Sequence, residues 1–190
     1  MVMIKERNEL DQKTNWQNSR ISESHDTDHG PEPIGLEVLI VHEDVATGLR
    51  AKDALVNLEN QIEIKTSFRL SLCRFGMLSD PQLAETALGQ ARRADIVFLS
   101  LHGDRDIAPV VRDWLLCWLE TRDFKPCALV DSLDATARET IKSNSTLNFM
   151  RVITAPLEVD LFLHLGSNPL TATDGMTLVN RHVPVGKSWI

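Results

Sequence analysis

Short apolar runs alternate with helix-patterned segments along most of this chain, and that alternation constrains the fold more than any other feature. Strands are predicted where the runs are rich in β-branched and other apolar residues, at 36–43, 62–75, 95–101, 126–132 and 149–155. Helices are predicted between and after them, at 44–61, 80–94, 108–122, 134–144 and 156–166. A regular strand–helix order predicts a doubly wound α/β domain, whose parallel sheet has helices on both faces.

Helix-start signals support these boundaries. Asp44 and Asp80 stand where an N-cap side chain is expected, and Pro81 takes the first helical position after Asp80. Asp134 opens the 134–144 segment in the same way.

Five parallel strands in a domain of this size favour the flavodoxin-like order 2-1-3-4-5. In that topology, ligands bind beyond the carboxyl ends of the strands, at the switch between strands one and three. The segment "HEDVATG" (42–48) follows the first strand, and "LHGDRD" (101–106) follows the third. We therefore expect these two loops to be neighbours that form a ligand crevice.

The chain divides into an arm, a domain and a tail. Residues 1–35 are polar, acidic and poor in periodic apolar positions, which predicts a disordered arm. Residues 36–166 form the predicted α/β domain. Residues 167–190 are predicted to be an irregular tail, with a possible edge strand at 176–183.

Charge and composition exclude several classes of partner. The net charge of −7 on 190 residues argues against nucleic acid, because a phosphate backbone needs a basic face. No apolar run approaches the ~20 residues of a membrane helix, and the first residues carry no apolar signal core. The three cysteines are odd in number and form no CxxC pair. We expect a cytoplasmic protein with reduced cysteines.

The predicted crevice draws its polar residues from the ends of three strands. The candidate ligand-binding residues are His42, Glu43, Asp44, Thr47, Gly48, Ser100, His102, Gly103, Asp104, Asp131 and Ser132. Gly103 is expected to allow a sharp turn, so that His102 and Asp104 face Asp44 and Thr47. Asp131 could instead cap the turn after the fourth strand.

Residues 101–109 resemble the loop after strand three of the flavodoxin family, with His102 where an aromatic residue would stack on the flavin ring. Thr47 and Gly48 resemble part of that family's phosphate loop, but its flanking hydroxyl residues are missing. The resemblance implies an FMN-binding electron-transfer protein. Glu43 and Asp44 oppose FMN, since a like-charge contact at ~5 Å costs about 3 kcal/mol at an effective dielectric of ~20.

A second resemblance is to response-regulator receiver domains. Glu43 and Asp44 resemble the receiver's acidic pair, and Ser132 resembles its hydroxyl residue. Ala155-Pro156 resembles its Lys-Pro pair without the lysine, and Ser100 stands where the phosphoacceptor aspartate would end strand three. The resemblance implies a receiver-like module that cannot be phosphorylated.

We expect a non-catalytic signalling module that binds a protein partner or a small ligand at the crevice, because each catalytic or cofactor signature is present only in part. No Gly-x-Ser-x-Gly nucleophile motif occurs, and no catalytic residue is assigned. The FMN-binding electron carrier is the first alternative. The second is a divalent-metal-binding domain that uses His42, Asp44, His102 and Asp104.

Overall fold

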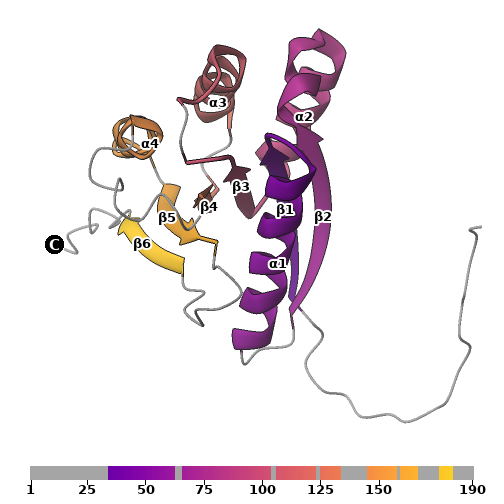
Figure 1. Cartoon of the computed structure of the whole chain (residues 1–190), viewed down its shortest axis with the longest axis vertical. Coiled ribbons are helices and arrows are strands. Elements are labelled where there is room, and N and C mark those ends of the chain that lie inside the picture. Colours follow the sequence, from indigo (N-terminus) through magenta and orange to yellow (C-terminus); the bar gives the residue numbers. More distant parts are fainter. Residues whose placement is uncertain are drawn as a thin grey trace, which may run out of the picture. The chain divides into compact units, whose positions relative to one another are not determined.

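The computed structural model describes residues 34–62, 66–103, 106–122, 125–133, 145–157, 159–166 and 176–181. These residues form a six-stranded sheet with the order β2-β1-β3-β4-β5-β6 (Figure 1). Its strands are β1 (Ile34–His42), β2 (Thr66–Arg74), β3 (Ile96–Ser100), β4 (Cys127–Leu133), β5 (Val159–Leu165) and β6 (Met176–Asn180). The first five strands are parallel, and β6 is antiparallel to β5.

Helices cover both faces of this sheet. They are α1 (Val45–Gln61), α2 (Pro81–Arg93), α3 (Pro109–Thr121) and α4 (Ser145–Thr154), with a 3-10 turn, η1, at Phe75–Ser79. In Figure 1, α1 lies in front of the sheet, and α2, α3 and α4 lie on the other side. Two apolar clusters match these layers: a small one beneath α1 and a larger one beneath the other helices. None of the helices in the described residues is long and apolar enough to cross a bilayer.

The predicted helix starts at Asp44 and Asp80 are confirmed. The Asp44 side chain caps α1, and the Asp80 carboxylate accepts hydrogen bonds from the amides of Gln82 and Leu83 at the start of α2. Both caps satisfy backbone donors that the first turn of a helix leaves unpaired. The strands beside these helices lie within the ranges predicted for them, apart from short differences at their ends.

The prediction fails between residues 149 and 166, where helix and strand are exchanged. Residues 149–155, predicted as the fifth strand, belong to α4, whose buried residues Thr146, Leu147, Met150 and Thr154 follow a helical period. Residues 156–166, predicted as a helix, contain β5. In β5 apolar residues recur at every second position, and a period of two is the pattern of a strand.

The sheet also has one strand more than predicted. The order 2-1-3-4-5 holds for the parallel strands, and β6 extends it at the β5 edge. The possible edge strand at 176–183 is thus present at Met176–Asn180. β1 begins at Ile34, inside the predicted arm boundary of 35. The rest of that arm, at 1–33, and the predicted helix at 134–144 lie outside the described residues.

Candidate functional site

Four polar side chains form a row across the carboxyl ends of neighbouring strands. The sheet register aligns His42 of β1 with Ser100 of β3, Ser100 with Ser132 of β4, and Ser132 with His164 of β5. Residues two positions earlier, including Ile40, Phe98 and Val130, pack in the cluster beneath α1. Since side chains alternate along a strand, the row faces α1 as well.

Hydrogen bonds connect this polar row to the start of α1 and also join two members of the row to each other within the sheet. The Ser100 hydroxyl donates to the Thr47 carbonyl at 2.7 Å, and His42 Nδ1 donates to the Asp44 carbonyl at 2.7 Å. The Ser132 hydroxyl lies 3.0 Å from His164 Nδ1, and both residues are buried. The row therefore joins the strand ends to the first turn of α1.

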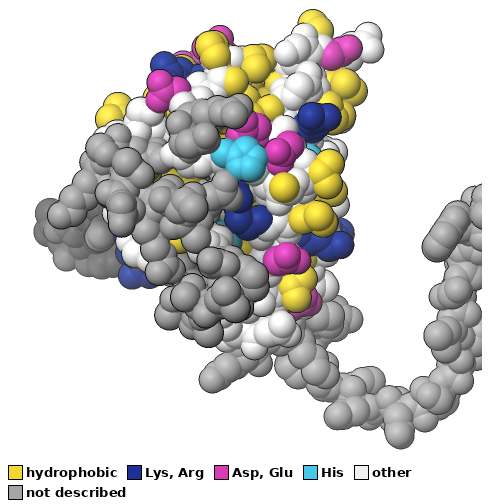
Figure 2. Space-filling view, viewed as in Figure 1, with side chains coloured by type: hydrophobic (Ala, Val, Ile, Leu, Met, Phe, Trp, Pro, Cys, Tyr) yellow, Lys and Arg dark blue, Asp and Glu magenta, His cyan; other side chains and the backbone are white. Residues whose placement is uncertain are grey.

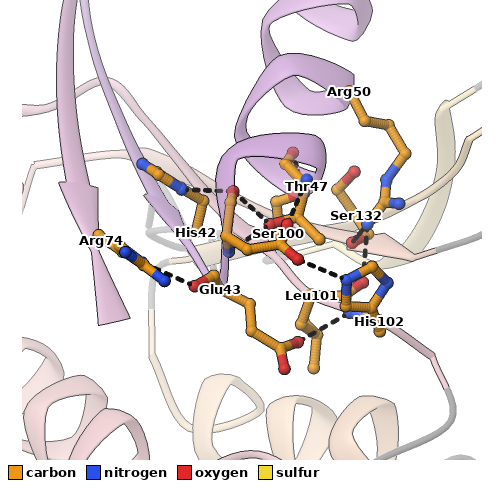
Figure 3. A network of polar contacts seen from close by, with 10 residues as sticks. His42, Glu43, Thr47, Arg50, Arg74, Ser100, Leu101, His102 and Ser132 are labelled. Atoms are coloured by element: carbon orange, nitrogen blue, oxygen red, sulfur yellow. Dashed lines mark hydrogen bonds and ion pairs between the residues drawn. The ribbon is translucent and has the colours of Figure 1, made fainter. Parts of the chain in front are cut away.

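The carboxylate of the N-cap residue Asp44 closes the N-terminus of α1. Figure 3 labels its two side-chain neighbours, Thr47 and His102. Asp44 Oδ1 accepts the Thr47 amide at 2.9 Å, and the Thr47 hydroxyl accepts the Asp44 amide at 2.9 Å. Asp44 Oδ2 lies 2.9 Å from His102 Nε2. The Thr47 amide first, and His102 second, hold the pKa of Asp44 far below its usual range. Asp44 is thus an anion that the helix end and the imidazole stabilise together.

His102 is positioned by acids on two sides. Its backbone amide donates to Glu43 Oε2 at 3.0 Å, and its ring nitrogen Nε2 contacts Asp44. Its side chain is 33% exposed. The residues after β1 and after β3 are therefore in contact, as the topology predicts, and the imidazole lies at the surface between them.

Arg50 brings a positive charge to the same edge. Its Nη2 donates to the Leu101 carbonyl at 2.7 Å and reaches the Ser132 carbonyl at 3.4 Å. Burial lowers the pKa of Arg50, while the charges of Asp44 and Glu43 raise it. The guanidinium thus crosses the ends of β3 and β4 close to both acids.

The structure separates the predicted site residues into groups. His42, Glu43, Asp44, Thr47, Ser100, His102 and Ser132 all take part in contacts at this edge. Gly48 lies against the His42 ring, where an added Cβ would be 3.0 Å from Nδ1. Gly103 follows His102 in the turn. Their roles in ligand binding remain predictions.

Asp131 does not join this group. It shares a side of β4 with Leu129 and Leu133, which pack in the cluster beneath α2, α3 and α4. It is fully buried, and among the described residues neither carboxylate oxygen has a hydrogen-bond partner. The residue therefore faces away from the crevice, and the turn that it was expected to cap lies outside the described residues.

The predicted metal site is not assembled by the described residues. Among them, no three His, Cys, Asp or Glu side chains gather in a way that could hold a metal ion. Asp104, the fourth predicted ligand, lies outside the described residues. His42 bonds the Asp44 backbone through its Nδ1.

Two residues of this edge were missed by sequence reasoning. His164 was placed in a helix, and only its true position on β5 aligns it with Ser132. Arg50 lies within the 44–61 segment and is predicted there only as part of a helix. The signal for His164 was its place among the alternating residues of β5; the direction of the long Arg50 side chain has no sequence signal.

The arrangement has two chemical consequences. A carboxylate that accepts from Nε2 holds an imidazole in one orientation and one tautomer, which suits the face of the ring for stacking against a flat ligand. At the helix end, the amide that would bind an anion already binds Asp44. This edge of the sheet therefore offers the oriented imidazole of His102. The anion site at the N-terminus of α1 is occupied by the chain's own carboxylate, that of Asp44.

Comparisons with known proteins add the following. No protein-family model matches the sequence. No curated protein matches it. Among solved structures, an azoreductase from Bacillus anthracis str. Sterne is similar over 69% of this chain and 87% of its own, with 10% identity and a TM-score of 0.43. An NAD(P)H:quinone oxidoreductase from Methanothermobacter marburgensis is similar over 73% of this chain and 88% of its own, with 9% identity and a TM-score of 0.45.

The expectation of a non-catalytic, receiver-like signalling module is contradicted. The receiver pattern fails within the chain, because Ala155-Pro156 precedes β5 instead of following it. Ser132, read as the receiver hydroxyl, is buried against His164. What remains is a flavodoxin-like arrangement of parallel strands with a polar carboxyl edge.

Proposed function

We propose that this chain binds a flavin at the carboxyl ends of β1 and β3 and acts as a flavodoxin-like redox protein. The observation that carries the proposal is the side chain of His102, one-third exposed at the junction of the two strands. Asp44 holds its imidazole, and Glu43 accepts a hydrogen bond from its backbone amide. A flat aromatic ring can stack on such an imidazole. When bound, a flavin supplies the redox chemistry, and the chain's residues bind and orient it.

The phosphate of FMN does not fit the N-terminus of α1. Asp44 already accepts the Thr47 amide there, and Glu43 adds a second negative charge beside it. A phosphate would have to displace Asp44 against like-charge repulsion of about 3 kcal/mol per contact at ~5 Å. The proposed ligand is therefore a flavin whose affinity comes from its ring system, and no part of the argument uses a phosphate contact.

Titration of the purified, ligand-free protein with riboflavin and with FMN tests this proposal, with flavin fluorescence as the measurement. We expect quenching by both flavins, with FMN binding no more tightly than riboflavin. The variant His102→Ala should weaken binding of both. The variant His102→Phe keeps a ring for stacking without the Asp44 contact, so it should retain most of the affinity and serves as the matched control.

Two results would contradict the proposal. The first is a wild-type protein that quenches the fluorescence of neither flavin up to about 100 μM. Titration to that concentration would detect a binding free energy of about −5 kcal/mol. The second is equal affinity of the wild type and His102→Ala, each with an unchanged melting temperature. A variant Asp44→Ser keeps an N-cap and removes the charge, so it should gain at least about tenfold in FMN affinity, a gain of about 1.4 kcal/mol.

A further inference from the structure

The edge strand β2 has an exposed apolar side. Its residues Phe68, Leu70 and Leu72 alternate along the strand, and Phe68 packs against the cluster beneath α1, so all three lie on the α1 face. Leu70 is 37% exposed and Leu72 is 55% exposed. Figure 2 shows hydrophobic side chains gathered on the side of the molecule where α1 and β2 lie. A long edge strand with exposed leucines is a surface suited to pairing.

Most of the devices that usually protect such an edge are missing from β2, whose charged residues are Arg69 and Arg74. Within the described residues, β2 ends the sheet, and no strand pairs with its outer side (Figure 1). The strand contains no proline and no lysine, and its nine residues pair with β1 without a bulge. Natural edge strands are commonly blocked by charges, prolines or bulges, since an open row of backbone donors and acceptors recruits another strand.

We propose that the outer edge of β2 pairs with β2 of a second copy of this chain, antiparallel about a two-fold axis at Leu70. The strand sequence is self-complementary in this register. Leu70 meets its own copy, and Phe68 meets Leu72 of the other chain, which buries the apolar row against itself. The strand is nine residues long, which gives the pairing an extended edge.

Charge supports this register over its neighbours. With the axis at Leu70, Arg69 lies opposite Ser71 and Arg74 lies opposite Thr66, so no like charges meet. An axis at Arg69 would place two guanidinium groups directly opposite each other, which is destabilising. An axis at Ser71 would put Arg74 against Phe68. Arg69 is also held on the other face by Glu37 of β1, at 3.1 Å, away from the leucines.

Sedimentation of the full chain over a concentration series tests the association. We expect a monomer–dimer equilibrium for the wild type, and a monomer for Leu70→Lys, which places two charges at the axis. The matched control is Val152→Lys, where the same charge replaces a residue that is 72% exposed on α4. It should dimerise like the wild type. A wild type that stays monomeric up to a concentration of about 1 mM, or a dimer that survives Leu70→Lys, would overturn the proposal.

Cross-linking tests the register. In a background with the exposed Cys117 replaced by serine, the variant Leu70→Cys brings two thiols to the axis, where facing Cα atoms lie about 4.5–5.5 Å apart and a disulfide can form. Leu72→Cys is the control, because its thiols would be separated by four residues along the strand, about 14 Å. Rapid oxidation of Leu70→Cys alone to a covalent dimer is the expected result. Equal or faster cross-linking of Leu72→Cys would refute this register.

Discussion

Replacing Asp131 by asparagine should remove a large pH dependence from the stability of this protein. Asp131 lies in the central strand β4, between Leu99 and Leu163 in the sheet register. It is fully buried, and both of its oxygens lack a hydrogen-bond partner in the part of the chain that the structure describes. Burial raises the pKa of Asp131 to about 7. The folded protein therefore holds this carboxyl group neutral under conditions where the unfolded chain ionises it.

The size of the effect follows from the two pKa values. An unfolded aspartate titrates near 3.9, so between about pH 4 and pH 7 the folded state binds one proton more than the unfolded state. Stability then falls by about 1.4 kcal/mol for each pH unit, about 4 kcal/mol over the interval. The full stability contributed by the neutral group is present below about pH 4 and is lost as the pH rises to the folded pKa.

Urea unfolding of the wild type and Asp131→Asn, measured from about pH 4 to about pH 7.5, gives the test. Asparagine keeps the shape and cannot ionise, so the variant should be the more stable protein at neutral pH, and its advantage should vanish toward pH 4. The control is Asp113→Asn, the same change on the exposed side of α3, which should keep the wild-type slope. If Asp131→Asn has the same slope as the wild type, the argument from burial is refuted.

Three further predictions concern the helix ends and one close contact. Asp44→Ala should cost about 1 kcal/mol of stability at neutral pH. Because the pKa of Asp44 is lowered, this cost should shrink below about pH 4. A cost independent of pH would contradict the charge argument. Gly166→Ala would place a Cβ against the Arg50 side chain and should destabilise the fold by about 1–3 kcal/mol, measured as a lower melting temperature. Gly76→Ala is the control, because an added Cβ there would meet nothing within 4 Å, and it should change the melting temperature little. Similar shifts of the melting temperature for both variants would exclude the clash. Asp80→Ala should lower the urea midpoint by an amount equivalent to about 1 kcal/mol, and an unchanged midpoint would mean that the α2 cap is not stabilising.

Much of the fold could be predicted because its signals are local. A strand beside a helix with an aspartate at its cap can be recognised within about fifteen residues, and α1 and α2 both begin where that signal placed them. The exchange of α4 and β5 shows the limit. The β-branched residues Val152 and Ile153 favoured a strand locally, whereas burial of Leu147 and Met150 against the sheet stabilises a helix.

The candidate site was predictable only as far as topology determines it. Adjacent strands bring their loops together, so contact between Asp44 and His102 followed from strand order. The side of the sheet on which Asp131 lies depends on strand register and on where β4 begins, which the sequence does not specify to one residue. The course of Arg50 over the strand ends depends on its packing beside Gly166.

The polar row across the strand ends also bears on how the sheet finds its correct alignment. Buried parallel strands are apolar on both faces, so a strand such as β4 has little in its hydrophobic pattern to tell one side from the other. A slip of one residue would turn Ser132 away from His164 and bring Asp131 beneath α1 in its place. The Ser132–His164 hydrogen bond and the Ser100–Thr47 hydrogen bond form only in the native alignment. The row thus helps to specify the register of the central strands, because each misaligned pairing would leave buried polar groups without their hydrogen-bond partners.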